Sequence, residues 1–490
     1  MEILIYDTLS GEKEPIEPRE DGLITMYTCG PTVYDSTHVG HLIPPVVGDV
    51  VKRFLESRGC RVKWAHNFTD VEDKIIRKAN ELGTTPEAVA ERYIQEYLEV
   101  MDAMGIDTVD VYPRVSEHME DIVNTIADLV DKGAAYVVNG DVYFDVARFP
   151  EYGQLSGRNV EELLAGARIE PDPRKRNPAD FALWKSAKPG EPSWPSPWGP
   201  GRPGWHIECS VMSVKHLGYP IDIHGGGIDL IFPHHENEIA QAEAHQGKGP
   251  FVRHWLHTGL LTMGDEKMSK SLGNFHRAKD MLERFGPMVL RFFILSHHYR
   301  SPREYSLERL EEARRAWQRL HNAVGNLREV LASAPAPGAA GQKELPAEVR
   351  ETLQRLADLT HEDGPFDQAM ADDFNTPQAI GVLFQVVREV NSLLGQGKPG
   401  PQVAAALRGA LDFLMTKGRL LGILGLEDPA AVGDRDGVAQ QLLDLLLDIR
   451  QDAREQRDWA LADRIRDGLA ELGIIVEDTA SGARVRWERR

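Results

Sequence analysis

A strand–helix–strand pattern near the start of the chain places the strongest limit on its fold. The residues Leu23–Cys29 form a short apolar run that ends at Gly30-Pro31, and apolar positions then recur at helical spacing over Leu42–Arg58. Gly59 is a typical helix end, and Arg61–Asn67 is typical of a second strand. Two strands joined through a helix lie parallel, and parallel sheets bind ligands at the carboxyl ends of their strands. We therefore expect an α/β fold with a ligand site at that edge.

Charge and cysteine content narrow the functional classes. The 490 residues carry a net charge of −20, so a nucleic-acid partner would need a local basic patch. The cysteines are Cys29, Cys60 and Cys209, too few and too scattered for a secreted disulfide framework. No apolar run reaches the roughly 18 residues of a membrane span, and the start lacks a secretion signal. We expect a cytoplasmic protein without membrane association.

The patterns change along the rest of the chain. Helical spacing gives way to a hairpin pattern around Val137–Val146, with Asn139-Gly140 at its turn. The proline-rich stretch Pro171–Pro203 is typical of an ordered loop over a surface. After Lys270, long helical periodicities predict a bundle, and the turn-rich stretch Glu427–Gly437 separates a small terminal domain.

Two histidines flank a glycine at the start of the first predicted helix, in the order His38-Val39-Gly40-His41. Unpaired amides and the helix dipole attract anions to such a position, and glycine lets a phosphate approach the backbone. The imidazoles would donate hydrogen bonds to the phosphate oxygens. The same pattern also occurs where one histidine caps a helix and the other lies at the surface. Taken alone, it leaves both interpretations open.

A second motif lies in Gly264–Asn274, where Lys267 and Lys270 stand three apart among glycines and small polar residues. A mobile loop of this kind brings ammonium groups to a leaving pyrophosphate. The alternative is a solvated surface loop. In this order, the two motifs resemble the HxGH and KMSKS signatures of class I aminoacyl-tRNA synthetases.

Further stretches resemble the cysteinyl-tRNA synthetase family, and the similarity covers nearly the whole chain. They are Cys29–Asp35, Asn67–Lys74, Gly204–Ser210, Asp222–Asp229, Pro233–Glu238, Arg291–Ser301, Asp372–Pro377 and Trp459–Asp463. The resemblance implies a cysteine–tRNA ligase with ATP, L-cysteine and tRNA(Cys) as partners. Such an enzyme forms cysteinyl-adenylate from L-cysteine and Mg-ATP, then passes cysteine to the 3′-terminal adenosine of tRNA(Cys). The family's usual state is a monomer.

The resemblance also implies the architecture. We expect a class I synthetase Rossmann-like parallel-sheet catalytic domain with an insertion, followed by an α-helical bundle and a small C-terminal α+β domain. The expected segments are 1–115 and 201–305 for the two halves of the catalytic domain, the second with the Lys267–Ser271 loop, 116–200 for the connective insertion, 306–426 for the bundle and 438–490 for the anticodon-binding domain.

A metal site is suggested by His234 and Glu238. Four residues apart on a helix, they would point from one face and hold one metal ion, whereas His235 and Glu236 would point elsewhere. Cys29 and Cys209 lack the close pairing of a zinc ribbon, so their spacing leaves each open as a ligand or as a buried thiol. The resemblance implies that one zinc ion per chain is held by Cys29, Cys209, His234 and Glu238.

Zinc would explain how cysteine is separated from serine. A pocket that recognises shape alone discriminates such near-isosteres by about 10–200-fold. Zinc binds a thiolate at about 2.3 Å and disfavours a neutral hydroxyl, so selection would occur at binding. Cys60 matches no family ligand and is expected to pack as a small apolar residue.

The resemblance assigns the remaining site residues. Thr69, Trp205 and His224 lie in stretches that line the amino-acid pocket with Cys29, although each residue type is equally common in a core. Asp229, after Gly227, would accept hydrogen bonds from the ATP ribose. The other expected ATP-binding residues are His38, Gly40, His41, Lys267 and Lys270, of which the histidines and lysines would be catalytic.

Two further features of the sequence bear on ligand binding. After His41 the family's usual Ala-Arg is replaced by Leu42-Ile43, so a cation near the nucleotide is missing, while Pro44-Pro45 fit a first helical turn. Near the carboxyl end, basic side chains with an aromatic ring suit single-stranded RNA or form a solvated tail. The candidate tRNA-binding residues are Arg484, Arg486, Trp487 and Arg489.

Two other functions compete with this hypothesis. A related ligase class joins activated cysteine to an amino-sugar, but those proteins lack the terminal anticodon-binding domain. A non-catalytic regulator on a synthetase scaffold is favoured only by Leu42-Ile43, and the intact lysines and presumed zinc ligands weigh against it.

Overall fold

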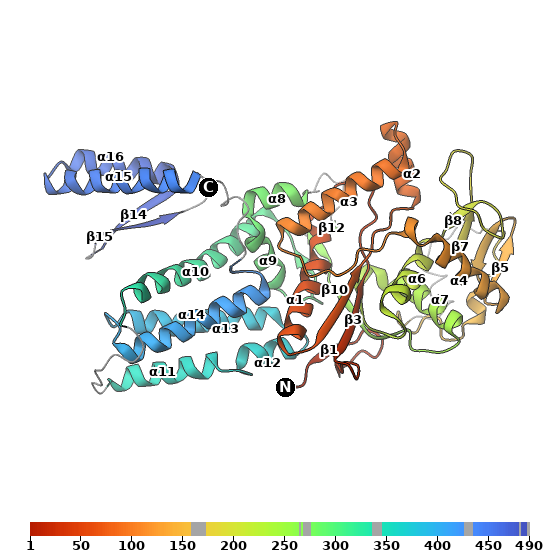
Figure 1. Ribbon diagram of the computed structural model, residues 1–490, viewed down its shortest axis with the longest axis horizontal. Coiled ribbons are helices and arrows are strands. Elements are labelled where there is room, and N and C mark those ends of the chain that lie inside the picture. Colours follow the sequence, from red (N-terminus) through yellow and green to blue (C-terminus); the bar gives the residue numbers. More distant parts are fainter. Residues whose placement is uncertain are drawn as a thin grey trace. The chain divides into compact units, whose positions relative to one another are not determined.

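The computed structural model describes residues 1–157, 173–263, 266–267, 276–335, 345–425, 435–479 and 482–487. The chain forms two compact units, Met1–Leu426 and Glu427–Arg490 (Figure 1). Among the described helices, none is long and apolar enough to cross a membrane.

A parallel sheet forms the centre of the first unit, as the strand–helix–strand pattern predicts. Its strands are β3 (Leu23–Thr28), β4 (Arg61–His66), β9 (Ile221–Gly227) and β10 (Val252–Thr258), in the order β10-β9-β3-β4. All three pairings are parallel, and the register aligns Thr28 with His66 and with Gly225. The turn η1 (Val39–Leu42) and helix α1 (Ile43–Ser57) connect β3 to β4. Gly48 lets α1 approach the sheet, because a Cβ there would lie 2.6 Å from the Trp64 ring.

Helices and a hairpin surround this sheet. Strands β1 (Leu4–Tyr6) and β2 (Lys13–Pro15) form the hairpin, and in the turn between them the Thr8 amide donates to the Trp255 carbonyl of β10. After β4 come α2 (Asp73–Leu82), α3 (Pro86–Ala103), η2 (Val115–Glu117) and α4 (Met119–Asp131). Helices α6 (Trp205–Leu217) and α7 (Glu236–Gln246) pack against each other, and α6 also contacts β3, β4 and β9.

The segment expected to be an insertion, 116–200, forms most of a second sheet, which is antiparallel. It contains β5 (Ala135–Val138), β6 (Asp141–Phe144), η3 (Val146–Arg148), β7 (Phe181–Ser186) and β8 (Gly201–Pro203), with the strands in sequence order. The predicted Asn139-Gly140 turn is confirmed, and both residues have positive φ. The prediction of a loop over Pro171–Pro203 is wrong where β7 and β8 form. Their pairing partners lie outside that stretch or far along it, so local composition does not reveal them.

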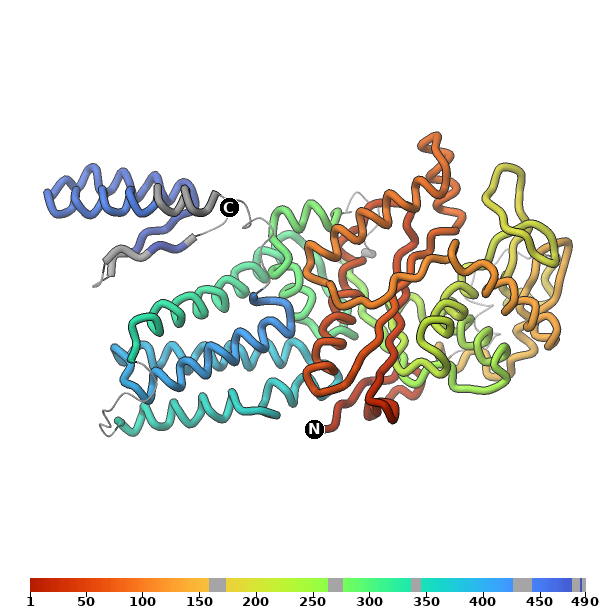
Figure 2. The backbone as a smooth tube through the Cα atoms, viewed as in Figure 1, coloured from red at the N-terminus to blue at the C-terminus, as the bar shows by residue number. Residues whose placement is uncertain are grey.

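The helical bundle follows the predicted lysine loop. The elements before it are β11 (Leu261–Met263), β12 (Glu266–Lys267), α8 (Ala278–Phe285), α9 (Pro287–Leu295) and β13 (Arg303–Glu304). The bundle is formed by α10 (Leu307–Ala332), α11 (Ala347–Thr360), α12 (Pro365–Ala371), α13 (Thr376–Leu394) and α14 (Pro401–Leu421). Its buried residues are continuous with the core beneath α1. In the view of Figure 2, this bundle and the insertion lie on opposite sides of the parallel sheet.

The second unit has the predicted α+β composition. It consists of α15 (Arg435–Glu455), α16 (Trp459–Glu471) and an antiparallel pair, β14 (Ile474–Thr479) with β15 (Gly482–Trp487). Its described core is small and contains Leu443, Leu469, Ile474 and Val476.

The segment between β9 and α7 leads to the site and has an irregular backbone. The turn η4 (Ile228–Leu230) follows β9 directly, and η5 (Ile231–His235) precedes α7. Phe232 has an extended conformation, with φ −135° and ψ 131°, so the helical path is broken there.

Candidate metal centre and active site

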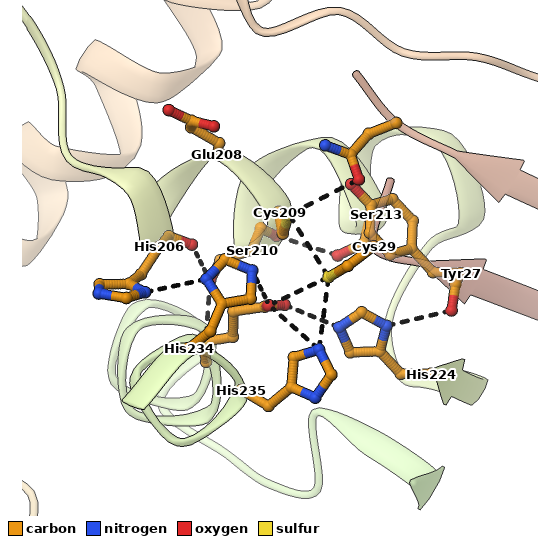
Figure 3. Close-up of polar contacts among 12 residues, drawn as sticks. Tyr27, Cys29, His206, Glu208, Cys209, Ser210, Ser213, His224, His234 and His235 are labelled. Atoms are coloured by element: carbon orange, nitrogen blue, oxygen red, sulfur yellow. Dashed lines mark hydrogen bonds and ion pairs between the residues drawn. The ribbon is translucent and has the colours of Figure 1, made fainter. Parts of the chain in front are cut away.

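Four side chains from separate parts of the first unit meet beyond the carboxyl end of β3. Cys29 follows β3, Cys209 lies in α6, His234 lies in η5, and Glu238 lies in the first turn of α7. Their ligand atoms all lie within 4.8 Å of one another (Figure 3). The Cys29 Sγ is 3.8 Å from the Cys209 Sγ and 3.7 Å from the Glu238 Oε1, and the His234 Nε2 is 2.9 Å from the same oxygen. The structure thus brings together all four residues of the predicted zinc site.

A tight contact between strand ends positions Cys29. The Gly30 amide donates to the Asn67 Oδ1 at 3.0 Å. A Cβ at Gly30 would lie 1.6 Å from the Asn67 carbonyl oxygen, so no other residue fits without a backbone shift. Only glycine lets the segments after β3 and β4 approach this closely.

His234 and Glu238 approach each other although they do not share a regular helix. His234 lies in the η5 turn, two residues before α7 begins at Glu236. The prediction that His235 points elsewhere is wrong, because its Nε2 is 3.3 Å from the Cys29 Sγ and 3.9 Å from the Glu238 Oε1. The π-type turn places both neighbouring imidazoles near the cluster, which an α-helical spacing would not. Cys29, His224, His235 and Glu238 therefore form a second, overlapping set of close ligand atoms.

The proton affinities in the cluster are strongly perturbed. The hydrogen bond from Cys29 lowers the pKa of Cys209 to about 6, against the effect of burial, and burial raises the pKa of Cys29. Burial opposes a charged His234, but the Glu238 charge and bonds to Cys209 and Glu238 raise its pKa to about 10. Burial also opposes a charged Glu238, yet His224 and His234 hold the pKa of that carboxyl well below its usual range. The buried negative charges are thus balanced by protons that a divalent cation would replace.

The donor set fits zinc better than a hard cation. Two sulfurs, one imidazole nitrogen and one carboxylate oxygen form a borderline-soft site, and fixed tetrahedral geometry suits such a set. Cys209, His234 and Glu238 are at most 1 % exposed, and Cys29 is partly exposed.

The predicted cysteine-pocket residues lie at different distances from this cluster. The Trp205 ring stacks on the His234 ring with centroids 4.3 Å apart. The His224 Nε2 is 2.8 Å from the Glu238 Oε2, and its Nδ1 is 3.1 Å from the Tyr27 carbonyl oxygen. Thr69 donates to the Glu208 Oε2 at 3.2 Å, so it contacts α6 rather than the presumed metal ligands.

The histidines of the first motif form a reciprocal cap. The Gly40 amide donates to the His38 Nδ1 at 3.1 Å, and the His38 amide donates to the His41 Nδ1 at 3.4 Å. The two rings stack with centroids 3.7 Å apart. Burial, with the charge of His38, lowers the pKa of His41 to about 3, so this imidazole is neutral. The capping interpretation therefore describes the mutual contacts of His38, Gly40 and His41.

The other predicted nucleotide contacts are placed only in part. Asp229 is exposed in η4, directly after β9, and a Cβ at Gly227 would lie 2.5 Å from its Oδ1. The backbone of Lys267 is in β12, whereas its side chain and the whole of Lys270 lie outside the described residues. Leu42 and Ile43 are buried in the core, with Pro44 in the first turn of α1.

The predicted tRNA-binding residues belong to the second unit. The Arg486 side chain forms an ion pair with Glu477, with 3.5 Å between Nη2 and Oε1. Arg484 and Trp487 lie on β15, but their side chains, like all of Arg489, lie outside the described residues.

Sequence reasoning missed two histidines beside the cluster. The His206 Nδ1 is 2.9 Å from the His234 Nδ1, and the His257 Nε2 is 2.8 Å from the His235 Nδ1. Burial holds the pKa of His206 well below its usual value and lowers that of His257 to about 3, so both are neutral. His206 lies in the Gly204–Ser210 stretch that resembles the family, and this resemblance was the only sequence feature that pointed to it. His257 lies in β10 and belongs to no motif.

Three families match successive parts of this chain. They are described as tRNA synthetases class I (C) catalytic domain over residues 15–315, DALR domain over residues 365–425, and Cysteinyl-tRNA ligase anticodon binding domain over residues 442–487.

Curated relatives match along the whole length. The cysteine–tRNA ligase of Pelotomaculum thermopropionicum is 49 % identical over 99 % of both chains. That of Heliobacterium modesticaldum is 49 % identical over 100 % of both, and that of Thermococcus onnurineus is 47 % identical over 100 % of this chain and 99 % of its own.

Solved structures share the fold at low sequence identity. A Mycobacterium tuberculosis methionyl-tRNA synthetase in complex with methionyl-adenylate has a TM-score of 0.60 at 17 % identity, covering 81 % of this chain and 90 % of that one. A putative arginyl-tRNA synthetase from Campylobacter jejuni has a TM-score of 0.59 at 12 % identity, covering 84 % and 95 %.

Proposed function

Because the chain belongs to the cysteine–tRNA ligase family, we propose that it forms cysteinyl-adenylate from L-cysteine and ATP and transfers the cysteinyl group to the 3′-terminal adenosine of tRNA(Cys). The observation that carries this proposal is the convergence of Cys29, Cys209, His234 and Glu238 at the ligand-binding edge of the parallel sheet. Family membership and site chemistry thus agree on a thiol-containing substrate.

These four residues would hold one zinc ion per chain. Bound zinc would favour a thiolate over a neutral hydroxyl and so select cysteine over serine. The partly exposed Cys29 marks the open side where the substrate sulfur would approach, with Trp205 and His224 beside it. His224 orients Glu238 through its 2.8 Å contact, and Trp205 covers the His234 ring.

Activation requires positioning rather than a protein nucleophile. A carboxylate oxygen of cysteine would attack the α-phosphorus of Mg-ATP, forming a new P–O bond as the bond to the leaving pyrophosphate breaks. His38, Gly40 and His41 line the start of α1 and would contact the triphosphate. Asp229 would accept from the ribose hydroxyls beside Gly227. Lys267 and Lys270 would stabilise the negative charge on the departing pyrophosphate.

The carboxyl-terminal unit favours tRNA over an amino-sugar as the acceptor. Residues 442–487 match an anticodon-binding family, and the unit has its own small core. We propose that Arg484, Arg486, Trp487 and Arg489 contribute to RNA binding there. Free thiols at all three cysteines support a reducing, cytoplasmic location, and the family's usual state suggests a monomer.

ATP–pyrophosphate exchange without tRNA tests the activation step. Purified protein should catalyse exchange with cysteine but not with serine, and a zinc chelator should abolish it. Aminoacylation of tRNA(Cys) then tests the acceptor. Absence of cysteine-dependent exchange in a folded, zinc-bound protein would refute the proposed activity, and exchange without aminoacylation would favour the amino-sugar alternative.

A further inference from the structure

A loop of the insertion lies against the start of α7. This loop, residues 149–157, directs three backbone amides at the Glu236 carboxylate. The Gly153 amide donates to Oε1 at 2.9 Å and the Ser156 amide to Oε2 at 2.9 Å, while the Leu155 amide approaches Oε1 at 3.5 Å. Glu236 has no exposed surface, so the amides take the place of water around a buried carboxylate.

A second contact path runs beside the first. Tyr152 of the same loop donates to the Asn237 Oδ1 at 2.5 Å. Its ring stacks on Phe181 of β7, with centroids 6.4 Å apart, and Phe181 meets the edge of His206 at 5.8 Å. His206 of α6 in turn lies 2.9 Å from His234 between the two Nδ1 atoms, so a second chain of contacts leads from the loop to this presumed ligand.

The start of α7 depends on such external contacts. The extended backbone at Phe232 interrupts the path from the preceding turn, and His235 at the N-cap of α7 makes no side-chain capping bond. Glu236 stands between His234 and Glu238 in the chain. Any rotation of this first turn would therefore change the distance between the two presumed ligands, which is now 2.9 Å.

We propose that Glu236 is a positioning residue for the metal site: by accepting the amides of Gly153, Leu155 and Ser156, it clamps α7 to the insertion and holds His234 and Glu238 at ligand distance. This inference rests on the proposed function, because it presupposes metal binding by the four residues. The insertion thereby acquires a role in the amino-acid site, although it supplies none of the four ligands.

The substitution Glu236→Gln tests the clamp with minimal change of shape. An amide side chain offers one acceptor oxygen and one NH2 group, and the latter would face a backbone donor. The buried amide that loses its acceptor would drive the loop and α7 apart. Residues that orient metal ligands typically contribute 10–100-fold to metal affinity, and we expect a loss in this range.

Glu243→Gln is the matched control. Glu243 lies on the same helix and also accepts a backbone amide, that of Phe251 at 2.9 Å. Its contact lies near the opposite end of α7 and does not involve the three loop amides that contact Glu236. We expect its zinc affinity to equal that of the unsubstituted chain.

The experiment measures zinc affinity of the full chain by competition with a chromophoric chelator, and records the visible absorption of the Co²⁺-substituted protein. Glu236→Gln should bind zinc 10–100-fold more weakly and should change the Co²⁺ spectrum, which reports ligand geometry, whereas Glu243→Gln should change neither. Ser156→Pro, which deletes one of the donating amides, should reproduce the affinity loss from the insertion side. Thermal unfolding of the metal-free variants shows whether they fold.

The outcomes separate this inference from the proposed function. Unchanged zinc affinity and an unchanged Co²⁺ spectrum in folded Glu236→Gln, with normal binding by the unsubstituted chain, would overturn the clamp alone. If Glu236→Gln fails to fold, folded Ser156→Pro with unchanged affinity would overturn it equally. Failure of the unsubstituted chain to bind zinc would overturn the proposed metal site and the clamp together.

Discussion

The Arg291 guanidinium and the Asp49 carboxylate form an ion pair in which neither side chain has any exposed surface. Arg291 lies in α9 and Asp49 in α1, so the pair joins the bundle side of the molecule to the crossover helix of the sheet. The Arg291 Nε also donates to the Leu421 carbonyl at 3.1 Å, at the end of α14. Gly422 makes room for this, because a Cβ there would lie 2.2 Å from the same Nε.

Removing Arg291 alone should be strongly destabilising. We expect Arg291→Met to lower the free energy of unfolding by about 3 kcal/mol, because the buried Asp49 carboxylate would lose its fully buried partner and keep only Arg53, whose Nε is 2.8 Å from Oδ1. Combining it with Asp49→Leu should recover part of the loss. Denaturant unfolding of the four proteins measures this coupling. Fully additive losses would show that the two residues act independently.

Acid should weaken the fold through His66. Its ring lies between the Thr28 Oγ1 and the Tyr97 Oη, each 2.7 Å away, and burial lowers its pKa to about 4. The unfolded chain therefore takes up the proton first, near pH 6.5, and stability falls as the pH drops from there to about 4. This difference corresponds to roughly 3 kcal/mol. His66→Gln should show a shallower loss over that window in pH-dependent thermal unfolding, and an equal slope would contradict the assignment.

Two glycine-to-alanine substitutions should have opposite effects. At Gly30 the new methyl group would meet the Asn67 carbonyl oxygen, so Gly30→Ala should cost about 3 kcal/mol and displace Cys29. Gly325 is exposed within α10 with no atom near its Cβ position, so Gly325→Ala should stabilise by about 0.5–1 kcal/mol. Unfolding midpoints decide both signs, and a tolerated Gly30→Ala would contradict the close contact.

Zinc retention should distinguish the cysteines. Cys209→Ser replaces a buried sulfur of the cluster, and we expect zinc affinity to fall at least about 100-fold because a serine oxygen is a poor zinc ligand. Cys60→Ser should keep full affinity, since Cys60 packs against the core outside the cluster. Metal content after dialysis against a weak chelator compares the two. Equal zinc loss in both proteins would remove Cys209 from the ligand set.

Sequence reasoning predicted the parts of the fold that local patterns encode. The strand–helix–strand unit, the Asn139-Gly140 turn and the helical bundle each follow from periodicity or turn residues within one segment. Strands β7 and β8 were missed, because their pairing depends on partners elsewhere in the insertion and their proline-rich surroundings lack alternation.

In the site, too, local spacing predicted some side-chain positions and missed others. The spacing of His234 and Glu238 correctly placed their side chains together, although His234 lies in the turn η5 and Glu238 in α7. The same helical assumption misplaced His235, because the π-type turn η5 brings both neighbouring imidazoles to the cluster. Glu236 gave no signal, since its partners are backbone amides whose positions no side-chain pattern records.

The long separation in sequence between Cys29 and Glu238 determines when the site can form during synthesis. These residues touch across 209 positions of sequence. At typical synthesis rates, about 10–40 seconds pass between the appearance of one and that of the other. The proposed set of four ligands is complete only after Glu238 has been added. A zinc ion held by all four residues would therefore bind only after β9 has paired with β3. Bound zinc would then indicate that this long-range pairing has formed.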